Sequence, residues 1–188
     1  MSPAPLILVV GPSGAGKDSL MDGARRRLAG DPGVHFARRV VTRPALAGAE
    51  DHDSLTPAAF EAREAAGGFL LSWRAHGLAY GVPAALNRLR GEGRAVVVNV
   101  SRTVVDEARA RLRPVGVLVV TAPADVLAAR LAGRGREEAG DIAHRLTRAA
   151  PMPAGPDVRV VVNDGGLEQG VQAFLRALRD LASAEMAA

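Results

Sequence analysis

Residues 11–17 read Gly-Pro-Ser-Gly-Ala-Gly-Lys, and this stretch decides the fold. It matches the phosphate-binding pattern GxxxxGK[ST] except at the last position, where Asp18 stands in place of Ser or Thr. The apolar run Leu6–Val10 precedes it and is typical of a buried parallel strand. Asp18–Ala29 follows with helical spacing, and Gly30 is a helix-stop signal. Strand, glycine-rich loop and helix, in this order, form the context that a P-loop requires.

The residue types of the loop indicate what it binds. Gly11 and Gly16 let backbone N–H groups turn toward phosphate oxygens, and the helix that follows adds its positive end. Lys17 is the single lysine among 24 basic residues, so a flexible ammonium is kept where it would reach the β- and γ-phosphates. A glycine-rich turn without a ligand is the weaker interpretation. The residues expected to bind ATP are Gly11, Pro12, Ser13, Gly14, Ala15, Gly16, Lys17, Asp18 and Ser19.

The rest of the chain alternates apolar strands with helical stretches. The expected strands are Ala95–Val100, Val115–Val120 and Val158–Asn163, and the expected helices are Thr103–Leu112, Pro123–Ala132 and Leu167–Ala182. Such alternation predicts an α/β fold of three layers, a parallel central sheet with helices on both faces. We expect one domain over residues 1–188, with its core in 1–34 and 91–188.

Two segments interrupt the alternation. In residues 35–90 we expect strands at His35–Val41, Phe69–Ala75 and Leu78–Gly81, and a short helix capped by Thr56 with Pro57 at its first position. We interpret this segment as an insertion that binds the second substrate. Residues 133–150 begin with a run rich in glycine and arginine, and we interpret them as a lid.

Composition narrows the function classes. Hydrophobic residues make up 48% of 188, there is no cysteine, and no apolar run reaches the roughly 20 residues of a membrane helix. A globular cytoplasmic enzyme without disulfides or thiolate metal sites is therefore expected, with no membrane partner. The net charge of +4 suits a highly phosphorylated small molecule. Nucleic-acid binding is disfavoured because aromatic residues are only 3% and the arginines are dispersed. A homodimer is left open.

Several motifs together resemble the guanylate kinase superfamily over nearly the whole chain. They are the P-loop, Val41-Thr-Arg43-Pro44 with Gly48 and Glu50, Tyr80-Gly81, Arg130-Leu-Ala-Gly-Arg134-Gly with Ile142 and Arg145-Leu146, and Val160-Val-Val-Asn163-Asp164. The resemblance implies that Arg43 and Tyr80 bind the acceptor phosphate. It also implies that Arg130, Arg134 and Arg145 close on the transferred phosphate, and that Asn163 lies at the adenine.

The residues that would read guanine depart from that family. Leu46, Ser72, Asn99 and Ser101 stand where it carries an arginine, a glutamate and an acidic strand end. Losing such hydrogen-bond partners costs orders of magnitude in base discrimination. The sequence therefore keeps the residues expected to bind ATP and lacks those that would recognise guanine.

A more specific resemblance is to the ribose 1,5-bisphosphate phosphokinases of phosphonate breakdown. Its strings are Gly16-Lys-Asp-Ser-Leu20, Thr42-Arg43, Gly48-Ala-Glu-Asp-His52, Leu71–Val82, Asn99-Val-Ser-Arg102 and Arg134-Gly-Arg-Glu137. It implies ATP-dependent phosphorylation of ribose 1,5-bisphosphate to 5-phosphoribosyl 1-diphosphate. The acceptor-binding residues expected from it are Arg43, Glu50, Ser72, His76, Tyr80, Ser101 and Arg102.

The expected chemistry needs no general base. A phosphate monoester has a second pKa near ~6 and is mostly a dianion at pH 7, so catalysis reduces to holding two anions together. The sequence offers Lys17, arginines and Mg²⁺, with Asp18 as the expected metal ligand. One alternative is a nucleoside monophosphate kinase with altered base preference. Another is a non-catalytic binding module, which the intact Gly16-Lys17 argues against.

Overall fold

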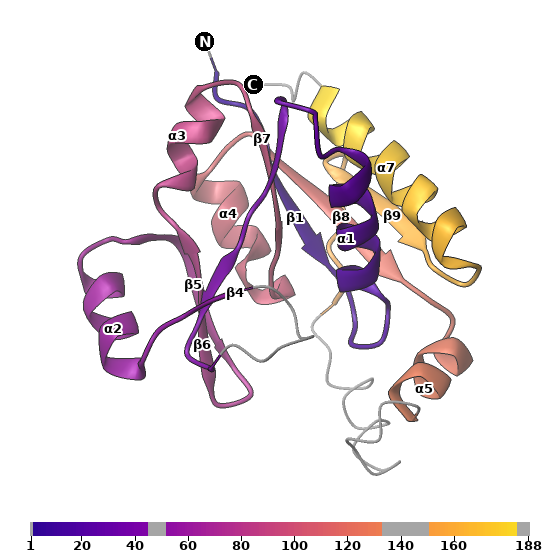
Figure 1. Cartoon of the computed structure of the whole chain (residues 1–188), viewed down its shortest axis with the longest axis horizontal. Coiled ribbons are helices and arrows are strands. Elements are labelled where there is room, and N and C mark those ends of the chain that lie inside the picture. The colour runs from indigo at the N-terminus through magenta and orange to yellow at the C-terminus, as the bar shows by residue number, and fades with distance from the viewer. Residues whose placement is uncertain (1, 45–51, 133–150, 184–188) are drawn as a thin grey trace.

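A computed structural model describes residues 2–44, 52–132 and 151–183 (Figure 1). Its central sheet has the order β2-β7-β1-β8-β9, and every neighbouring pair in it is parallel. The strands are β1 (Leu6–Val10), β2 (Val34–Phe36), β7 (Ala95–Asn99), β8 (Val115–Thr121) and β9 (Val158–Val162). The predicted parallel sheet is thus confirmed, with strand ends that move by one residue.

Helices cover both faces of this sheet, which confirms the three layers. The helices are α1 (Lys17–Arg27), α3 (Leu86–Gly91), α4 (Val105–Arg111) after a 3₁₀ turn (Arg102–Val104), α5 (Ala124–Ala132) and α7 (Leu167–Ser183). In β1, Ile7 and Val9 pack toward α1 and α7, and the alternate residues Leu6 and Leu8 pack toward α3 and α4. Every side chain of β1 is fully buried. The strand that leads into the P-loop is therefore held from both sides.

A second sheet lies beside the first, within the predicted insertion. Its order is β4-β3-β6-β5, from β3 (Arg39–Val41), β4 (His52–Ser54), β5 (Phe69–Ala75) and β6 (Leu78–Pro83), with α2 (Pro57–Ala65) packed against it. The Thr56 hydroxyl accepts a hydrogen bond from Ala59 N at 3.2 Å, so the predicted cap of α2 is present. Leu71 and Trp73 of β5 join the core beneath α3 and α4. This contact fixes the second sheet against the central one.

The predicted strand His35–Val41 is two strands in two different sheets. β2 pairs with β7 of the central sheet, and β3 pairs with β4 and β6 of the second sheet. Phe36 packs against the main core, whereas Val40 packs against Phe60 in a separate small core. The chain therefore crosses between the sheets at residues 37–38.

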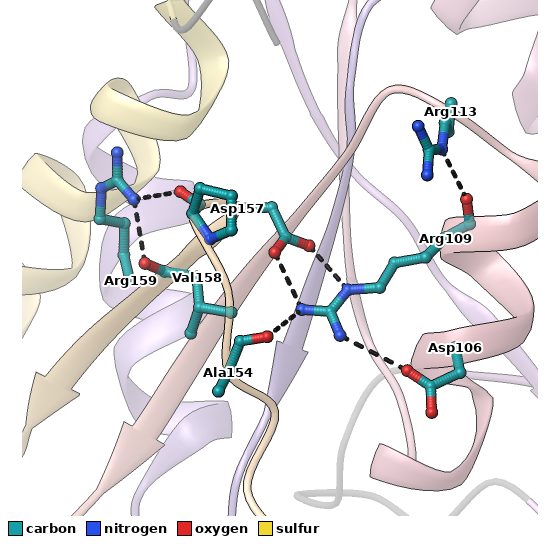
Figure 2. A network of polar contacts seen from close by, with 8 residues as sticks. Asp106, Arg109, Arg113, Ala154, Asp157, Val158 and Arg159 are labelled. Atoms are coloured by element: carbon teal, nitrogen blue, oxygen red, sulfur yellow. Dashed lines mark hydrogen bonds and ion pairs between the residues drawn. The ribbon is translucent and has the colours of Figure 1, made fainter. Parts of the chain in front are cut away.

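The segment that enters β9 is fastened to α4 by Arg109 (Figure 2). Its Nε and Nη2 donate to the two carboxylate oxygens of Asp157 at 2.8 and 2.9 Å, and Nη2 also donates to the carbonyl of Ala154 at 3.0 Å. The hydrogen bonds to Asp157 raise the pKa of Arg109 above its ordinary value. These hydrogen bonds fix the segment before β9 against α4.

Within the described residues, the helices are too short or too polar to cross a bilayer.

Candidate nucleotide and acceptor site

The P-loop lies at the carboxyl end of β1 and leads directly into α1. Gly11, Gly14 and Gly16 have φ values of 150°, 83° and 87°, in the region that favours glycine. A Cβ on Gly11 would lie 1.9 Å from the carbonyl oxygen of Val120, so no other residue fits there. Gly16 caps α1 without a side-chain hydrogen bond. The first N–H groups of α1 therefore point from a loop without bulky side chains, as phosphate binding requires.

Lys17 is the first residue of α1, and its ammonium folds back over the loop. Its Nζ donates to the carbonyls of Gly11 at 2.9 Å and Pro12 at 3.0 Å. The side chain is half-buried, so the charge lies within the curve of the loop. An ammonium held there by two neutral carbonyls can exchange them for phosphate oxygens, which are stronger acceptors.

Two residues support the loop from the β8 and β9 side. Asn163, just after β9, is 6% exposed, and its Nδ2 donates to the carbonyl of Ala15 at 2.8 Å. Arg130, near the end of α5, has Nη1 3.5 Å from the carbonyl of Gly14. The predicted proximity of Arg130 to the phosphates is consistent with this position. The hydrogen bond from Asn163 to Ala15 stabilises the P-loop. The predicted contact of Asn163 with adenine stays a prediction.

On the other side, the end of β7 contacts the first turn of α1. Asn99 is 8% exposed, and its Nδ2 donates to Oδ1 of Asp18 at 3.0 Å. Asp18 itself is exposed and so is Ser19. The contact leaves the second carboxylate oxygen of Asp18 and the amide oxygen of Asn99 beside the P-loop. The sequence carried one signal for this relation: the strand end that often bears a carboxylate beside a P-loop has none here, and Asp18 stands on the loop instead.

The wall that faces Asn99 comes from the second sheet and carries a stacked group. The rings of Trp73 and Tyr80 are 5.3 Å apart and almost parallel, at 4°. The guanidinium of Arg39 lies 5.3 Å from the Tyr80 ring centroid and 5.8 Å from that of Trp73. Arg39 was not among the predicted site residues. An arginine in a short apolar strand of the insertion, two residues before Val41, was the available signal.

Arg39 also lines a small hollow between α1 and the second sheet. The cavity measures about 30 Å³ and is lined by Asp18, Met21, Asp22, Arg25, Ala37, Arg39 and Asn99. Because Asp18 and Asp22 are exposed, the hollow opens to solvent. It therefore joins the P-loop to the wall formed by the second sheet.

Other predicted acceptor residues are engaged elsewhere. Hydrogen bonds from Arg74 and Ser72 lower the pKa of Glu64, which places the Ser72 hydroxyl on the α2 side of the sheet rather than beside Tyr80. His76 is exposed at the tip of the β5–β6 hairpin with φ 52°. The predicted roles of Ser72 and His76 in acceptor binding stay predictions.

The residues after β7 also serve local structure. Ser101 Oγ accepts from Thr103 N at 3.3 Å and from Thr103 Oγ1 at 2.9 Å, which caps the 3₁₀ turn. Arg102 Nη1 donates to Sδ of Met152 at 3.1 Å, and burial lowers the pKa of Arg102. Both residues lie at the carboxyl end of β7, where ligands bind in open α/β sheets, and their substrate contacts stay predictions.

Arg43 follows β3 by two residues. Its carbonyl lies 3.2 Å from Nε2 of the buried His52. Its Nε is buried and has no hydrogen-bond partner within the described residues. A phosphate would supply such a partner, as predicted for this residue. Glu50, Arg134 and Arg145, like the predicted lid 133–150, lie outside the described residues.

Comparisons with known proteins place this geometry among kinases. A family model described as an AAA domain matches residues 7–152. The chain is 50% identical to a ribose 1,5-bisphosphate phosphokinase of Methylobacterium radiotolerans, over 94% of the chain and 98% of that protein. It is 51% identical to a bifunctional ribose 1,5-bisphosphokinase-thymidine phosphorylase of Cupriavidus pinatubonensis, over 94% of the chain but 29% of that protein. It therefore spans under a third of this longer relative.

A solved structure shows the same fold. The guanylate kinase of Anaplasma phagocytophilum superimposes with a TM-score of 0.67, covering 98% of this chain and 90% of that one at 18% identity. At this identity the likeness concerns the fold alone.

Proposed function

The chain belongs to the ribose 1,5-bisphosphate phosphokinase family, with an AAA-domain core, and from this membership we propose that it phosphorylates ribose 1,5-bisphosphate with ATP. The products are 5-phosphoribosyl 1-diphosphate and ADP. The observation that carries the proposal is the 50% identity over 98% of a relative of that name. An intact P-loop beside a wall that carries an arginine fits the same reaction, because both substrates are phosphates.

The chemistry asks the protein to position and to neutralise charge. An oxygen of the acceptor's 1-phosphate forms a bond to the γ-phosphorus of ATP, and the bond from that phosphorus to the β-phosphate oxygen breaks. No proton has to be removed from the dianionic acceptor at pH 7. The N–H groups of the P-loop and Lys17 hold the donor phosphates, and Arg130 lies beside them at Gly14.

Mg²⁺ fits the donors at the start of α1. Among the described residues no three His, Cys, Asp or Glu side chains gather into a metal site. Mg²⁺ in kinases is bound by one or two carboxylates together with substrate phosphates, so a full protein cage is not needed. We assign it to Asp18, whose carboxylate is oriented by Asn99 at 3.0 Å. When bound, Mg²⁺ neutralises charge on the phosphates.

A product assay tests the proposed reaction. Phosphorus NMR of the protein with ATP and ribose 1,5-bisphosphate should show the diphosphate signals of 5-phosphoribosyl 1-diphosphate and ADP. Lys17→Ala is the matched control, because losing a preorganised charge at the transferred phosphate should cost about 3 kcal/mol or more of transition-state stabilisation in a protein that still folds. Phosphorylation of GMP without any diphosphate sugar would instead favour a nucleoside monophosphate kinase.

A further inference from the structure

We propose that Asn163 is a positioning residue for the donor phosphates, because its side chain sets the direction of one N–H group of the P-loop; this inference rests on the proposed use of ATP. Asn163 directly follows β9 and, with Asn99, is one of two asparagines that are buried in the described part of the chain. Burying an amide costs free energy unless its polar groups are hydrogen-bonded. The partners of Asn163 therefore indicate what its amide does.

Two hydrogen bonds and a close packing contact fix Asn163 in place. Its backbone N donates to the carbonyl of Thr121 at 2.7 Å, which extends the pairing of β9 with β8 by one residue. Its side-chain Nδ2 donates to the carbonyl of Ala15 at 2.8 Å. A Cβ on Gly170 of α7 would lie 2.8 Å from Oδ1, so the amide packs against helix backbone that carries no side chain. Because a carbonyl only accepts, the amide cannot turn over without losing its buried hydrogen bond.

The hydrogen bond from Asn163 fixes the peptide that joins Ala15 to Gly16. This peptide is planar and trans, so its C=O and N–H groups point in opposite directions. Since the C=O is directed at Asn163, the N–H of Gly16 is directed away from it. A Cβ on Gly16 would lie 2.5 Å from Nδ2 of Asn163, so the amide lies directly against the loop backbone. The direction of this N–H therefore depends on a side chain from the far end of the sequence.

The N–H of Gly16 is available to a ligand. The N–H of Ala15 donates to the carbonyl of Pro12 at 3.3 Å, and the carbonyl of Gly16 accepts from Leu20 N at 3.0 Å. Within residues 2–44, 52–132 and 151–183, nothing accepts from the N–H of Gly16 itself. Gly16 immediately precedes α1, whose N-terminal end favours an anion. A phosphate oxygen of the donor is the acceptor that suits this N–H.

This role differs from the contact with adenine that the sequence resemblance implies. A side chain that recognises adenine needs its amide groups exposed to the base. Asn163 instead directs Nδ2 at Ala15, and only 6% of the residue is exposed. Every nucleoside triphosphate carries the same phosphates, so a residue that acts through the P-loop contributes equally whichever base is attached. Loss of the amide should therefore weaken all triphosphates by the same factor.

Binding of three ligands tests the inference. Calorimetry with Mg²⁺ would give the Kd for ATP, for GTP and for inorganic tripolyphosphate, which has no base. Asn163→Leu removes the donor at similar volume without adding charge, and it should raise all three Kd values about 10-fold with their ratios unchanged. A rise for ATP alone would assign Asn163 to adenine and overturn the inference. Three unchanged values would also overturn it and leave the proposed function standing, whereas a wild type that does not bind ATP would overturn both.

The matched control is Gln172→Leu, which also replaces an amide by leucine. Nε2 of Gln172 donates to Glu168 at 3.0 Å on the exposed side of α7, so this variant should leave the three Kd values unchanged. Melting curves of both variants report whether they are folded.

Nuclear magnetic resonance of the wild type tests the same inference without any substitution. The amide proton signal of Gly16 should move downfield to a similar extent with ATP and with tripolyphosphate, because a phosphate oxygen accepts its hydrogen bond in both cases. The side-chain amide signals of Asn163 should also respond alike to the two ligands. A Gly16 signal that does not move, or Asn163 signals that respond to ATP alone, would overturn the inference.

Discussion

At the scale of single residues, the contact between Asp18 and Asn99 explains the one departure from the P-loop pattern. The usual arrangement pairs a hydroxyl on the loop with a carboxylate on a neighbouring strand, both directed to Mg²⁺. Here the carboxylate stands on the loop and the neutral amide on the strand, 3.0 Å apart. The carboxylate therefore stands on the loop instead of the strand, and a neutral amide takes its place on the strand.

We therefore predict that the carboxylate can be moved from position 18 to position 99 with metal binding largely kept. Asp18→Asn should raise the Mg²⁺ concentration needed for nucleotide binding at least about 10-fold, and Asn99→Leu, which releases the carboxylate, by about 10-fold. The double variant Asp18→Ser, Asn99→Asp returns the charge to the strand and should recover most of the loss. Mn²⁺ binding in the presence of ADP, followed by electron paramagnetic resonance, measures this without turnover. If metal binding is the same in all four proteins, Asp18 only complements the positive end of α1, a contribution of about 0.3–1 kcal/mol.

Arg90 gives a prediction about stability that is separate from the site. Arg90→Met should lower the free energy of unfolding by about 2–4 kcal/mol, since the carbonyls of Ala4 and Leu112 and the side chain of Asn87 lose the hydrogen bonds that the buried guanidinium donates. The control is Arg88→Met, because Arg88 is 81% exposed and its pair with Glu92 at 3.5 Å should contribute under about 0.5 kcal/mol. Urea unfolding of the two variants gives the comparison. Equal stabilities would mean that Arg90 is dispensable to the scaffold.

The P-loop could be located from the sequence because one short motif carries all of its residues. Lys17 and the glycines lie within seven positions, so their relative geometry follows from local structure. Arg39 and Asn99 act through partners that are 34 to 81 positions away. Such contacts depend on how the second sheet docks, which no local pattern encodes.

At the scale of elements, the attachment of α4 to the start of β9 is open to a double-mutant cycle. Arg109→Met and Asp157→Asn should each destabilise the protein, with a coupling of about 1–3 kcal/mol between them, because the pair is bidentate and its side chains are only 25% and 15% exposed (Figure 2). Thermal unfolding of the two single variants and the double variant measures the coupling. Asp106, which lies 3.4 Å from Arg109 but is 96% exposed, supplies the control: Asp106→Asn should change stability by under about 0.5 kcal/mol. A coupling near zero would contradict the view that this pair anchors β9.

Strand β2 should make stability depend on pH. Burial is the main cause that lowers the pKa of His35, and the charges of Arg94 and Arg25 lower it further. Because the folded pKa lies below the unfolded value near 6.5, the unfolded chain binds the proton more readily, so stability is present above about pH 6.5 and is lost as the pH falls through the folded pKa. His35→Gln should therefore flatten the fall in melting temperature between pH 7 and pH 5, and Arg94→Gln should make it shallower. Parallel curves for the three proteins would show that His35 does not contribute.

The sequence predicted a strand or helix correctly where all of its apolar residues pack into the cores of a single sheet. Leu6–Val10 is an uninterrupted apolar run and coincides with β1. His35–Val41 failed because its two halves are apolar toward two different cores, around Phe36 and around Val40. Periodicity reports that a residue is buried, and it does not report which core buries it.

At the scale of the whole molecule, the candidate site is lined by two sheets that come from different parts of the sequence. The central sheet supplies the P-loop, Asp18 and Asn99, and the second sheet supplies Arg39, Tyr80 and Trp73. Residues 71 and 73 of β5 lie in the same core as β7, which holds the two sheets in contact. The P-loop is therefore carried by the central sheet, and the stacked wall beside it is carried by the second sheet.

This division predicts how the substrates affect the melting temperature. A non-hydrolysable ATP analogue with Mg²⁺, and ribose 1,5-bisphosphate, should each stabilise the folded state, by about 2.7 kcal/mol at a hundredfold excess over Kd, which corresponds to a rise of about 5–10 °C for a domain of this size. Both together should raise the melting temperature by at least the sum, because each orders one wall of the cleft that the other must meet. GMP at the same concentration should have no effect, since Ser72, Asn99 and Ser101 carry no carboxylate that could accept hydrogen bonds from a guanine, and the Asn99 amide already donates to Asp18. A rise with GMP that matches the rise with the bisphosphate would identify the acceptor as a nucleotide.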